Sequence, residues 1–214
     1  MFVAEEPISY STFAVIDLLD AFASNEPVPG GGSAAALAGA LGVSLLVMAA
    51  GLPKTRTMSP EEAADLAEAS SRLRPLRESL IELVDRDSDA YREVMVALKR
   101  PKQSDAEKAA RREAIQAAMR EATDVPLDVM RACQQSLAGA VVVARNAYRL
   151  AASDAGTGIE LLVAAVRGCA LSIDGNLAGL ADPAYVARVR SERQQLDSDA
   201  TADADRARAL LAGD

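Results

Sequence analysis

Three consecutive glycines, Gly30 to Gly32, stand directly before an uncharged stretch that begins at Ser33 and runs to Leu52. Glycine lets the backbone approach a ligand closely, and the first turn of a helix offers free N–H groups and the positive end of the helix dipole. This pattern is typical of a site that receives an anion such as a carboxylate or a phosphate. A flexible connector, with Ser33 as the N-cap of the helix, is the other interpretation, and the sequence leaves both open.

The sequence contains no histidine, which excludes Ser-His-Asp triads, Cys-His pairs and histidine-ligated zinc. The two cysteines, Cys133 and Cys169, lie in separate apolar runs. We expect them to be small buried hydrophobic residues, and we expect no metal site. Proton transfer would therefore fall to carboxylates, lysine or tyrosine.

The composition limits the fold and the partners. The 214 residues predict a single domain, 1–214, and a formal net charge of -8 argues against nucleic acid, whose phosphates are bound by clustered Lys and Arg. Hydrophobic residues make up 50% but aromatic residues only 3%, which favours closely packed helices built from Ala, Leu and Val. No basic segment and cleavage site precede the first apolar stretch, so the predicted location is the cytoplasm.

Helical periodicity runs through nearly the whole chain and predicts an all-α fold. The expected helices cover residues 12–23, 34–50, 60–98 with a bend at Pro75, a segment after Ser104, 127–150, 157–171 and 184–211. Pro126 is expected to interrupt or kink the helix in which it lies.

The uncharged helix is long enough to span a bilayer. Ala and Gly dominate its first half and the other helices are amphipathic, so we expect the central helix of a single-domain bundle, covered on all sides, and no membrane. Small residues recur at four-residue spacing, as in Ala38 and Gly42 or in Ala35 and Gly39, and let a neighbouring helix approach closely. One bundle of this size covers such a helix only with effort, which predicts a homo-oligomer.

Four motifs in order carry a family resemblance: "PVPGGGSAAALAGALGVSLL", "DRDSDAYREVMVALKRPK", "EATDVPLDVMRAC" and "SDAGTGIELLVAAVRGCALSIDGNL". Together they resemble the formiminotransferase-cyclodeaminase C-terminal family, which includes cyclodeaminases and cyclohydrolases of tetrahydrofolate derivatives. The resemblance covers nearly the whole chain. It implies an all-helical fold, a dimer or higher homo-oligomer, a folate substrate and no further cofactor.

The family's reactions are hydrolysis of 5,10-methenyltetrahydrofolate to the 10-formyl compound, and cyclisation of 5-formiminotetrahydrofolate with release of ammonia. Both need a proton donor or acceptor near the bridge carbon and negative potential around a cationic centre. The resemblance implies Asp154, beside Ser153 at a helix start, as the catalytic carboxylate, and Lys54 as a catalytic cation. The alternatives are that Asp154 caps its helix and that Lys54 complements a helix C-terminus.

The resemblance also implies a set of substrate-binding residues: Gly30, Gly31, Gly32, Ser33, Arg56, Asp87, Ser153 and Asn176. A carboxylate such as Asp87 suits the N3–H and 2-amino donors of a pterin, whereas Arg56 suits a folate carboxylate. Asp87 and Asp89 are two residues apart and point in different directions on a helix, so at most one faces the site. An exposed helix charge is the alternative interpretation of Asp87.

The chain departs from the family pattern at two places. "GLPKTR" is shorter than the family's lysine-rich loop, and Tyr148 and Leu150 stand where the family has two asparagines. These departures keep a second hypothesis open, in which a helical oligomer retains the fold and a ligand pocket but has altered catalysis. Between the two reactions the sequence favours hydrolysis, because the chain is expected to lack a fused formiminotransferase half.

Overall fold

The computed structural model describes residues 9–52 and 58–213. Its elements are η1 (Tyr10–Thr12), α1 (Val15–Ala23), α2 (Gly31–Gly51), α3 (Pro60–Leu98), α4 (Asp105–Asn146), η2 (Arg149–Ala151), α5 (Ala152–Leu177) and α6 (Pro183–Ala212). No strand occurs in the described part of the chain, and the predicted all-α class is confirmed.

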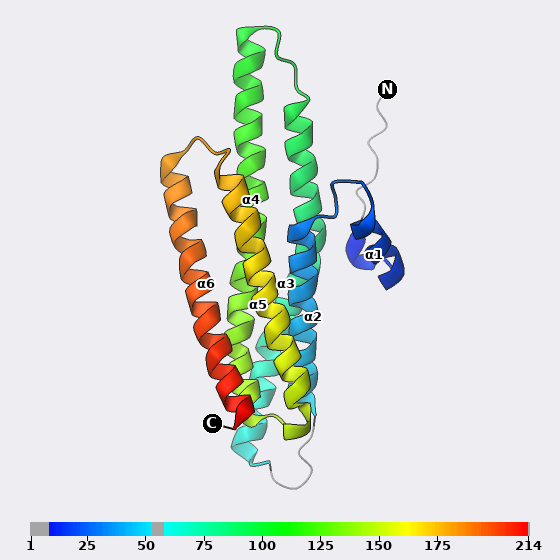
Figure 1. Cartoon of the computed structure of the whole chain (residues 1–214), viewed down its shortest axis with the longest axis vertical. Helices are drawn as coiled ribbons and strands as arrows, with labels where there is room; N and C mark the ends of the chain where they lie inside the picture. Colours follow the sequence, from blue (N-terminus) through cyan, green and yellow to red (C-terminus); the bar gives the residue numbers. More distant parts are fainter. Residues whose placement is uncertain (1–8, 53–57, 214) are drawn as a thin grey trace.

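Helices α2 to α6 form an elongated bundle, and α1 lies beside it (Figure 1). Helix α4 packs against α3, α5 and α6 and also touches α2, so it is the centre of the bundle. Helix α2 packs mainly between α3 and α5. The hairpin that α3 and α4 form projects beyond the ends of the other helices (Figure 1).

The two longest helices begin at capping boxes. At the start of α3, Glu62 N–H donates to the Ser59 hydroxyl at 3.1 Å and Ser59 N–H donates to the Glu62 carboxylate at 2.8 Å. Ser104 and Glu107 repeat the arrangement at the start of α4. These reciprocal bonds satisfy amide groups that a helix start leaves without partners, which explains why both starts were predictable.

The predicted interruption at Pro126 is wrong, because α4, which is 42 residues long in all, continues through Pro126 to Asn146. Proline lacks the N–H that would bond the carbonyl four residues earlier, here that of Ala122. The side-chain amide of Asn176 donates to this carbonyl at 2.7 Å instead. The helix therefore keeps its acceptor satisfied without a break.

Small residues bring the helices together as predicted. A Cβ added to Gly42 of α2 would lie 2.7 Å from the Gly158 carbonyl oxygen of α5, and one added to Gly158 would lie 2.8 Å from that of Gly42. A Cβ on Gly39 would lie 2.8 Å from Cys133 Sγ of α4. Cys133 and Cys169 are both free and fully buried, as expected, and burial raises the pKa of the Cys133 thiol to about 12.

Helix α2 is covered on one face only, which differs from the expected complete coverage. Leu41 and Met48 of α2 are 53% and 42% exposed, and Leu171 of the adjoining α5 is 75% exposed. By length and composition α2 could cross a membrane (mean hydropathy 2.0), as could Arg149–Leu177 (mean hydropathy 1.4). In each of them, however, half of the most apolar 18-residue stretch is buried in the bundle. Both helices are thus core helices with one apolar face left open.

Candidate functional site

A cavity of about 400 Å³ lies at the start of α2, where the last turns of α5, the last third of α3 and the first half of α4 meet it. It is lined by Pro27, Val28, Gly30, Gly31, Gly32, Asp87, Tyr91, Val94, Met119, Ala122, Leu171, Ser172, Gly175 and Asn176. The structure therefore brings together five of the predicted site residues: the three glycines, Asp87 and Asn176. The volume is within the usual range for small-molecule sites.

Asp87 packs directly against the glycine turn. A Cβ on Gly32 would lie only 2.0 Å from Asp87 Oδ1, so no side chain fits there while the carboxylate keeps its place. The Ser33 hydroxyl donates to Asp87 Oδ2 at 2.9 Å and lies 3.1 Å from Ser88 Oγ. A carboxylate from α3 thus closes the N-terminus of α2.

Burial raises the pKa of the Asp87 carboxyl, and hydrogen bonds from the Ser33 hydroxyl and N–H offset part of that rise. The cavity consequently holds a carboxylate that is poorly hydrated, which strengthens its interaction with a cationic or hydrogen-bond-donating ligand.

Ser33 is neither the N-cap nor part of the cavity wall. The N-cap of α2 is Gly30, which has no side chain that could cap the helix. Helix α2 begins at Gly31, three residues before the predicted start at 34. Ser33 is fully buried in the first turn. Its hydroxyl positions Asp87 and is not itself exposed to a ligand in the cavity.

The neighbouring carboxylates of the same motif have other partners. Asp85 accepts hydrogen bonds from Ser9, from the Tyr10 N–H at 2.6 Å and from Ser11, which fixes η1 to α3. Asp89 pairs with Arg92 at 2.6 Å. Of Asp87 and Asp89, only Asp87 lines the cavity, as their spacing predicted.

Tyr10 connects this anchor to the cavity. Its hydroxyl donates to the Val28 carbonyl at 3.2 Å, its ring lies under the Arg92 guanidinium at 5.5 Å, and Arg92 donates to its hydroxyl at 3.0 Å. The segment before the glycines is therefore held from outside by η1. The role of Tyr10 was not predictable, because no local pattern in the sequence connects it to Val28.

Two further cavity residues follow from helical spacing. Tyr91 lies four residues after Asp87, and Ser172 four residues before Asn176, so each shares a face with its predicted neighbour. Met119 comes from α4 and carried no recognisable signal in the sequence. Asn176 donates its Nδ2 to the Ala122 carbonyl, and its side-chain oxygen Oδ1 makes no hydrogen bond with a described residue.

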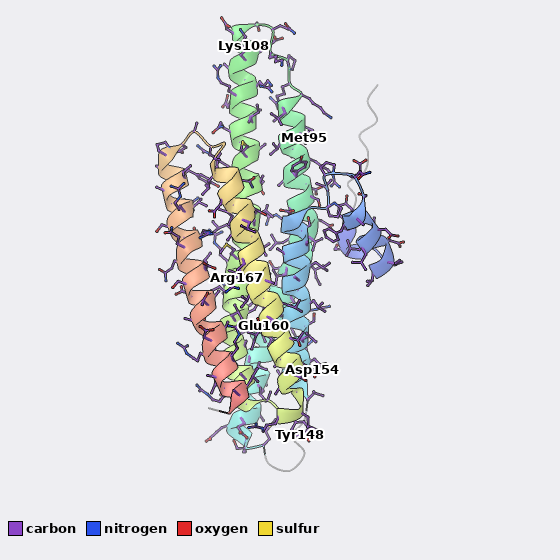
Figure 2. The ribbon with its side chains drawn as sticks, in the orientation of Figure 1. Met95, Lys108, Tyr148, Asp154, Glu160 and Arg167 are labelled. Atoms are coloured by element: carbon purple, nitrogen blue, oxygen red, sulfur yellow. The ribbon has the colours of Figure 1, made fainter. Side chains whose placement is uncertain are left out.

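Asp154 and Ser153 lie far from this cavity. They belong to the first turn of α5, which begins at Ala152, five residues before the predicted 157. The nearest cavity residue of α5, Leu171, lies 17 residues after Asp154, or about 25 Å at the rise of an α-helix. Figure 2 shows Asp154 near Tyr148 at one end of the bundle, and Met95 toward the other.

Asp154 does not act as the N-cap of its helix. Ala151 holds the N-cap position and has no side-chain capping bond, and Asp154 lies half-buried in the first turn. Its charge is still favourable beside the positive end of the α5 dipole. Lys54 and Arg56, for which catalytic and binding roles were predicted, lie outside the described residues.

The sequence profile of the formiminotransferase-cyclodeaminase family matches residues 14–195. The chain is 38% identical over 184 residues to the methenyltetrahydrofolate cyclohydrolase of Methylorubrum extorquens AM1, covering 86% of this chain and 88% of that protein. It is 27% identical over 157 residues to the formimidoyltransferase-cyclodeaminase of Gallus gallus, covering 73% of this chain but 29% of that longer protein.

The fold is also similar to a solved structure. The crystal structure of formiminotetrahydrofolate cyclodeaminase from Thermotoga maritima superposes with a TM-score of 0.84, covering 94% of this chain and 97% of that one, at 22% identity. Since the family profile spans most of the chain and a relative of 38% identity matches it nearly end to end, the chain belongs to the formiminotransferase-cyclodeaminase family.

Proposed function

We propose that the protein hydrolyses 5,10-methenyltetrahydrofolate to 10-formyltetrahydrofolate, acting in the cytoplasm and without a cofactor beyond the folate. Water adds to the bridge carbon and releases one proton, which gives a neutral hydroxyl adduct. The bond from that carbon to N5 then breaks as the hydroxyl loses its proton to form the C=O of the formyl group on N10, and N5 takes up a proton, so that one proton is released in all. Hydrolysis is favoured over cyclodeamination because the cyclohydrolase relative is the more similar of the two curated relatives, at 38% against 27% identity.

The observation that carries the proposal is Asp87 held against Gly32 inside the cavity. A poorly hydrated carboxylate suits the two adjacent donors of a pterin, N3–H and the 2-amino group, and its charge favours the cationic methenyl form. Tyr91 and Met119 line the same cavity and offer apolar surface to a flat ring. Gly31, next to which nothing lies within 4 Å of an added Cβ, leaves the backbone open to the ligand.

We further propose that the protein works as a homodimer through the open face of α2 and α5. Helix α2 carries no charged residue, and Leu41, Met48 and Leu171 leave a large apolar area exposed. Such areas mark interaction surfaces. Leu171 belongs both to this face and to the cavity wall, so a second copy seated there would complete the wall.

A two-fold axis perpendicular to the helices would also bring Asp154 to the substrate. In such an isologous dimer each end of α5 faces the opposite end of the partner's α5. Asp154 of the partner subunit would then lie beside the cavity that contains Asp87, and would act as the catalytic carboxylate. For Lys54 and Arg56 we retain the predicted roles, proton transfer and contact with the folate carboxylates.

The first experiment follows the loss of 5,10-methenyltetrahydrofolate by absorbance, corrected for the spontaneous rate. Asp87→Asn and Asp154→Asn are each expected to lower the enzymatic rate about 100-fold or more. Glu93→Gln is the matched control, because it removes an exposed charge of α3 that does not line this cavity. Turnover of 5-formiminotetrahydrofolate alone would replace hydrolysis by cyclodeamination, and inactivity on both substrates would overturn the proposal.

Subunit mixing tests the shared site separately. Asp87→Asn and Asp154→Asn proteins are denatured together, refolded and assayed. If the partner supplies Asp154, half of the random dimers are mixed and each has one intact site, so activity returns to about a quarter of the wild-type value. A mixture as inactive as the two separate variants, with a mixed dimer demonstrated by mass, would show that the partner does not supply Asp154 to the cavity and would refute the shared site alone.

A further inference from the structure

A second hollow lies in the groove between α3 and α4, away from the proposed folate site. It has a volume of about 410 Å³ and is lined by Asp65, Glu68, Ala69, Arg72, Leu73, Leu76, Gln135, Ala138, Gly139, Val142 and Arg145. A further hollow of about 440 Å³ continues it along the groove past Pro75 and Gln134. None of these residues lines the cavity that contains Asp87.

Small residues of α4 produce the hollow. Ala138 is exposed and Gly139 half-buried, opposite the buried Leu73 of α3. A Cβ on Gly139 would lie 3.2 Å from Leu73 Cδ2, so the floor is closed by contact while the space above Ala138 stays open. The floor of the hollow is apolar, because Ala69 and Val142 form it together with Leu73.

The charges at the rim are unequally satisfied. Glu68 is ion-paired with Arg72 on the same helix, and Asp65 accepts a hydrogen bond from Asn146 Nδ2 at 3.0 Å. The guanidinium of Arg145 makes no ion pair or hydrogen bond with any described residue, and the same holds for the side-chain amide of Gln135. The Arg145 guanidinium is therefore the one charged group of the rim without a partner among the described residues.

We propose that the α3–α4 hollow is a second ligand site, which takes a small organic anion with an apolar body. The apolar body covers Ala69, Leu73 and Val142, and the anionic group receives the forked donors of Arg145. The Gln135 amide adds a neutral donor on the same helix. The hollow shares no residue with the folate cavity, and its residue nearest to Asp87 along α3, Leu76, lies 11 residues before Asp87, or about 16 Å.

The probe for this proposal is 8-anilinonaphthalene-1-sulfonate, which combines an aromatic body with one sulfonate and fluoresces when it leaves water. Titration of the full chain is expected to show saturable binding. Arg145→Gln is expected to weaken it roughly tenfold through loss of a charge-assisted hydrogen bond. Arg74→Gln, which removes an exposed charge of α3 outside the hollow, is expected to leave the affinity unchanged.

A second pair of variants tests the location. Ala138→Leu fills the hollow from an exposed position and is expected to abolish saturable binding, whereas Ala109→Leu, at an exposed position of α4 outside the hollow, is expected to retain it. Circular dichroism and melting curves check that each variant is folded. Absence of saturable binding to the wild type, or binding that Ala138→Leu and Arg145→Gln leave intact, would overturn the proposal.

Discussion

Asn176 of α5 donates a hydrogen bond from Nδ2 to the carbonyl oxygen of Ala122 in α4 at 2.7 Å. This carbonyl would bond the N–H four residues later, but Pro126 occupies that position and has none. The Asn176 side chain therefore satisfies a backbone acceptor of another helix and, at the same time, lines the proposed folate cavity. The finding connects the continuity of α4 to the shape of the site.

The Asn176 bond can be tested by a double-mutant cycle. Asn176→Ala is expected to lower the free energy of unfolding by about 1 to 3 kcal/mol, because the Ala122 carbonyl is left without its partner. In a Pro126→Ala background the new N–H can bond that carbonyl, so the same substitution should cost less. Urea unfolding of the four proteins measures the coupling, and equal costs in both backgrounds would refute this role of Asn176.

We expect that position 32 must be glycine because the Asp87 carboxylate leaves no room for a side chain there, and not because of the helix geometry. In Gly32→Ala the new Cβ displaces the carboxylate from the Ser33 hydroxyl, which should cost about 1 to 3 kcal/mol of stability and most of the folate turnover. Gly31→Ala is the control for stability, since an added Cβ there meets nothing within 4 Å. Urea unfolding and the methenyltetrahydrofolate assay measure the two effects. A Gly32→Ala protein as stable and as active as the wild type would contradict the contact.

Local sequence patterns predicted the elements whose determinants are local. The bounds of α3 follow from Ser59, Pro60 and Glu62 at its start and from the apolar periodicity up to Leu98, and the structure has the same helix. The break at Pro126 was predicted wrongly because the side chain that compensates for it, Asn176, lies 54 residues from Ala122, whose carbonyl it bonds. Neither the residue types nor their spacing in the sequence predicts such a pairing.

The site was predictable in part for the same reason. The glycine turn and Asp87 each carried a signal, but their contact joins residues far apart in the sequence and appears only when α2 packs on α3. The motif placed Asp154 with them in one site, whereas Asp154 lies at the start of α5 and the cavity lies at the end of α5. Sequence order alone does not tell which end of a helix a motif occupies relative to another helix.

The pKa of Asp87 predicts a pH dependence of stability with a definite sign. Burial raises the pKa in the folded state above the ordinary value of 3.8, so the folded chain holds more protons than the unfolded one between these two values. The contribution of Asp87 to stability is therefore fully present below pH 3.8 and falls as pH rises through the folded pKa. Asn cannot ionise, so Asp87→Asn should lack this dependence.

The measurement is the difference in unfolding free energy between wild type and Asp87→Asn at several pH values from acid to neutral. We expect the variant to gain stability relative to the wild type as pH rises. Carboxylates with lowered pKa, such as Glu160 beside Arg208, act with the opposite sign but are common to both proteins and cancel in the difference. A difference that is flat, or that changes in favour of the wild type, would contradict the raised pKa.

The crossing of α2 and α5 predicts the most sensitive glycines of the core. In Gly42→Ala the Cβ would lie 2.7 Å from the Gly158 carbonyl oxygen, which is backbone and cannot rotate away. The two helices must then separate, at an expected cost of about 1 to 3 kcal/mol. Gly175→Ala on α5 meets nothing within 4 Å and should be neutral or gain up to about 1 kcal/mol from helix propensity. Thermal and urea unfolding of both variants test this contrast. Equal stability of Gly42→Ala and Gly175→Ala would mean that α2 and α5 do not approach each other through Gly42 and Gly158.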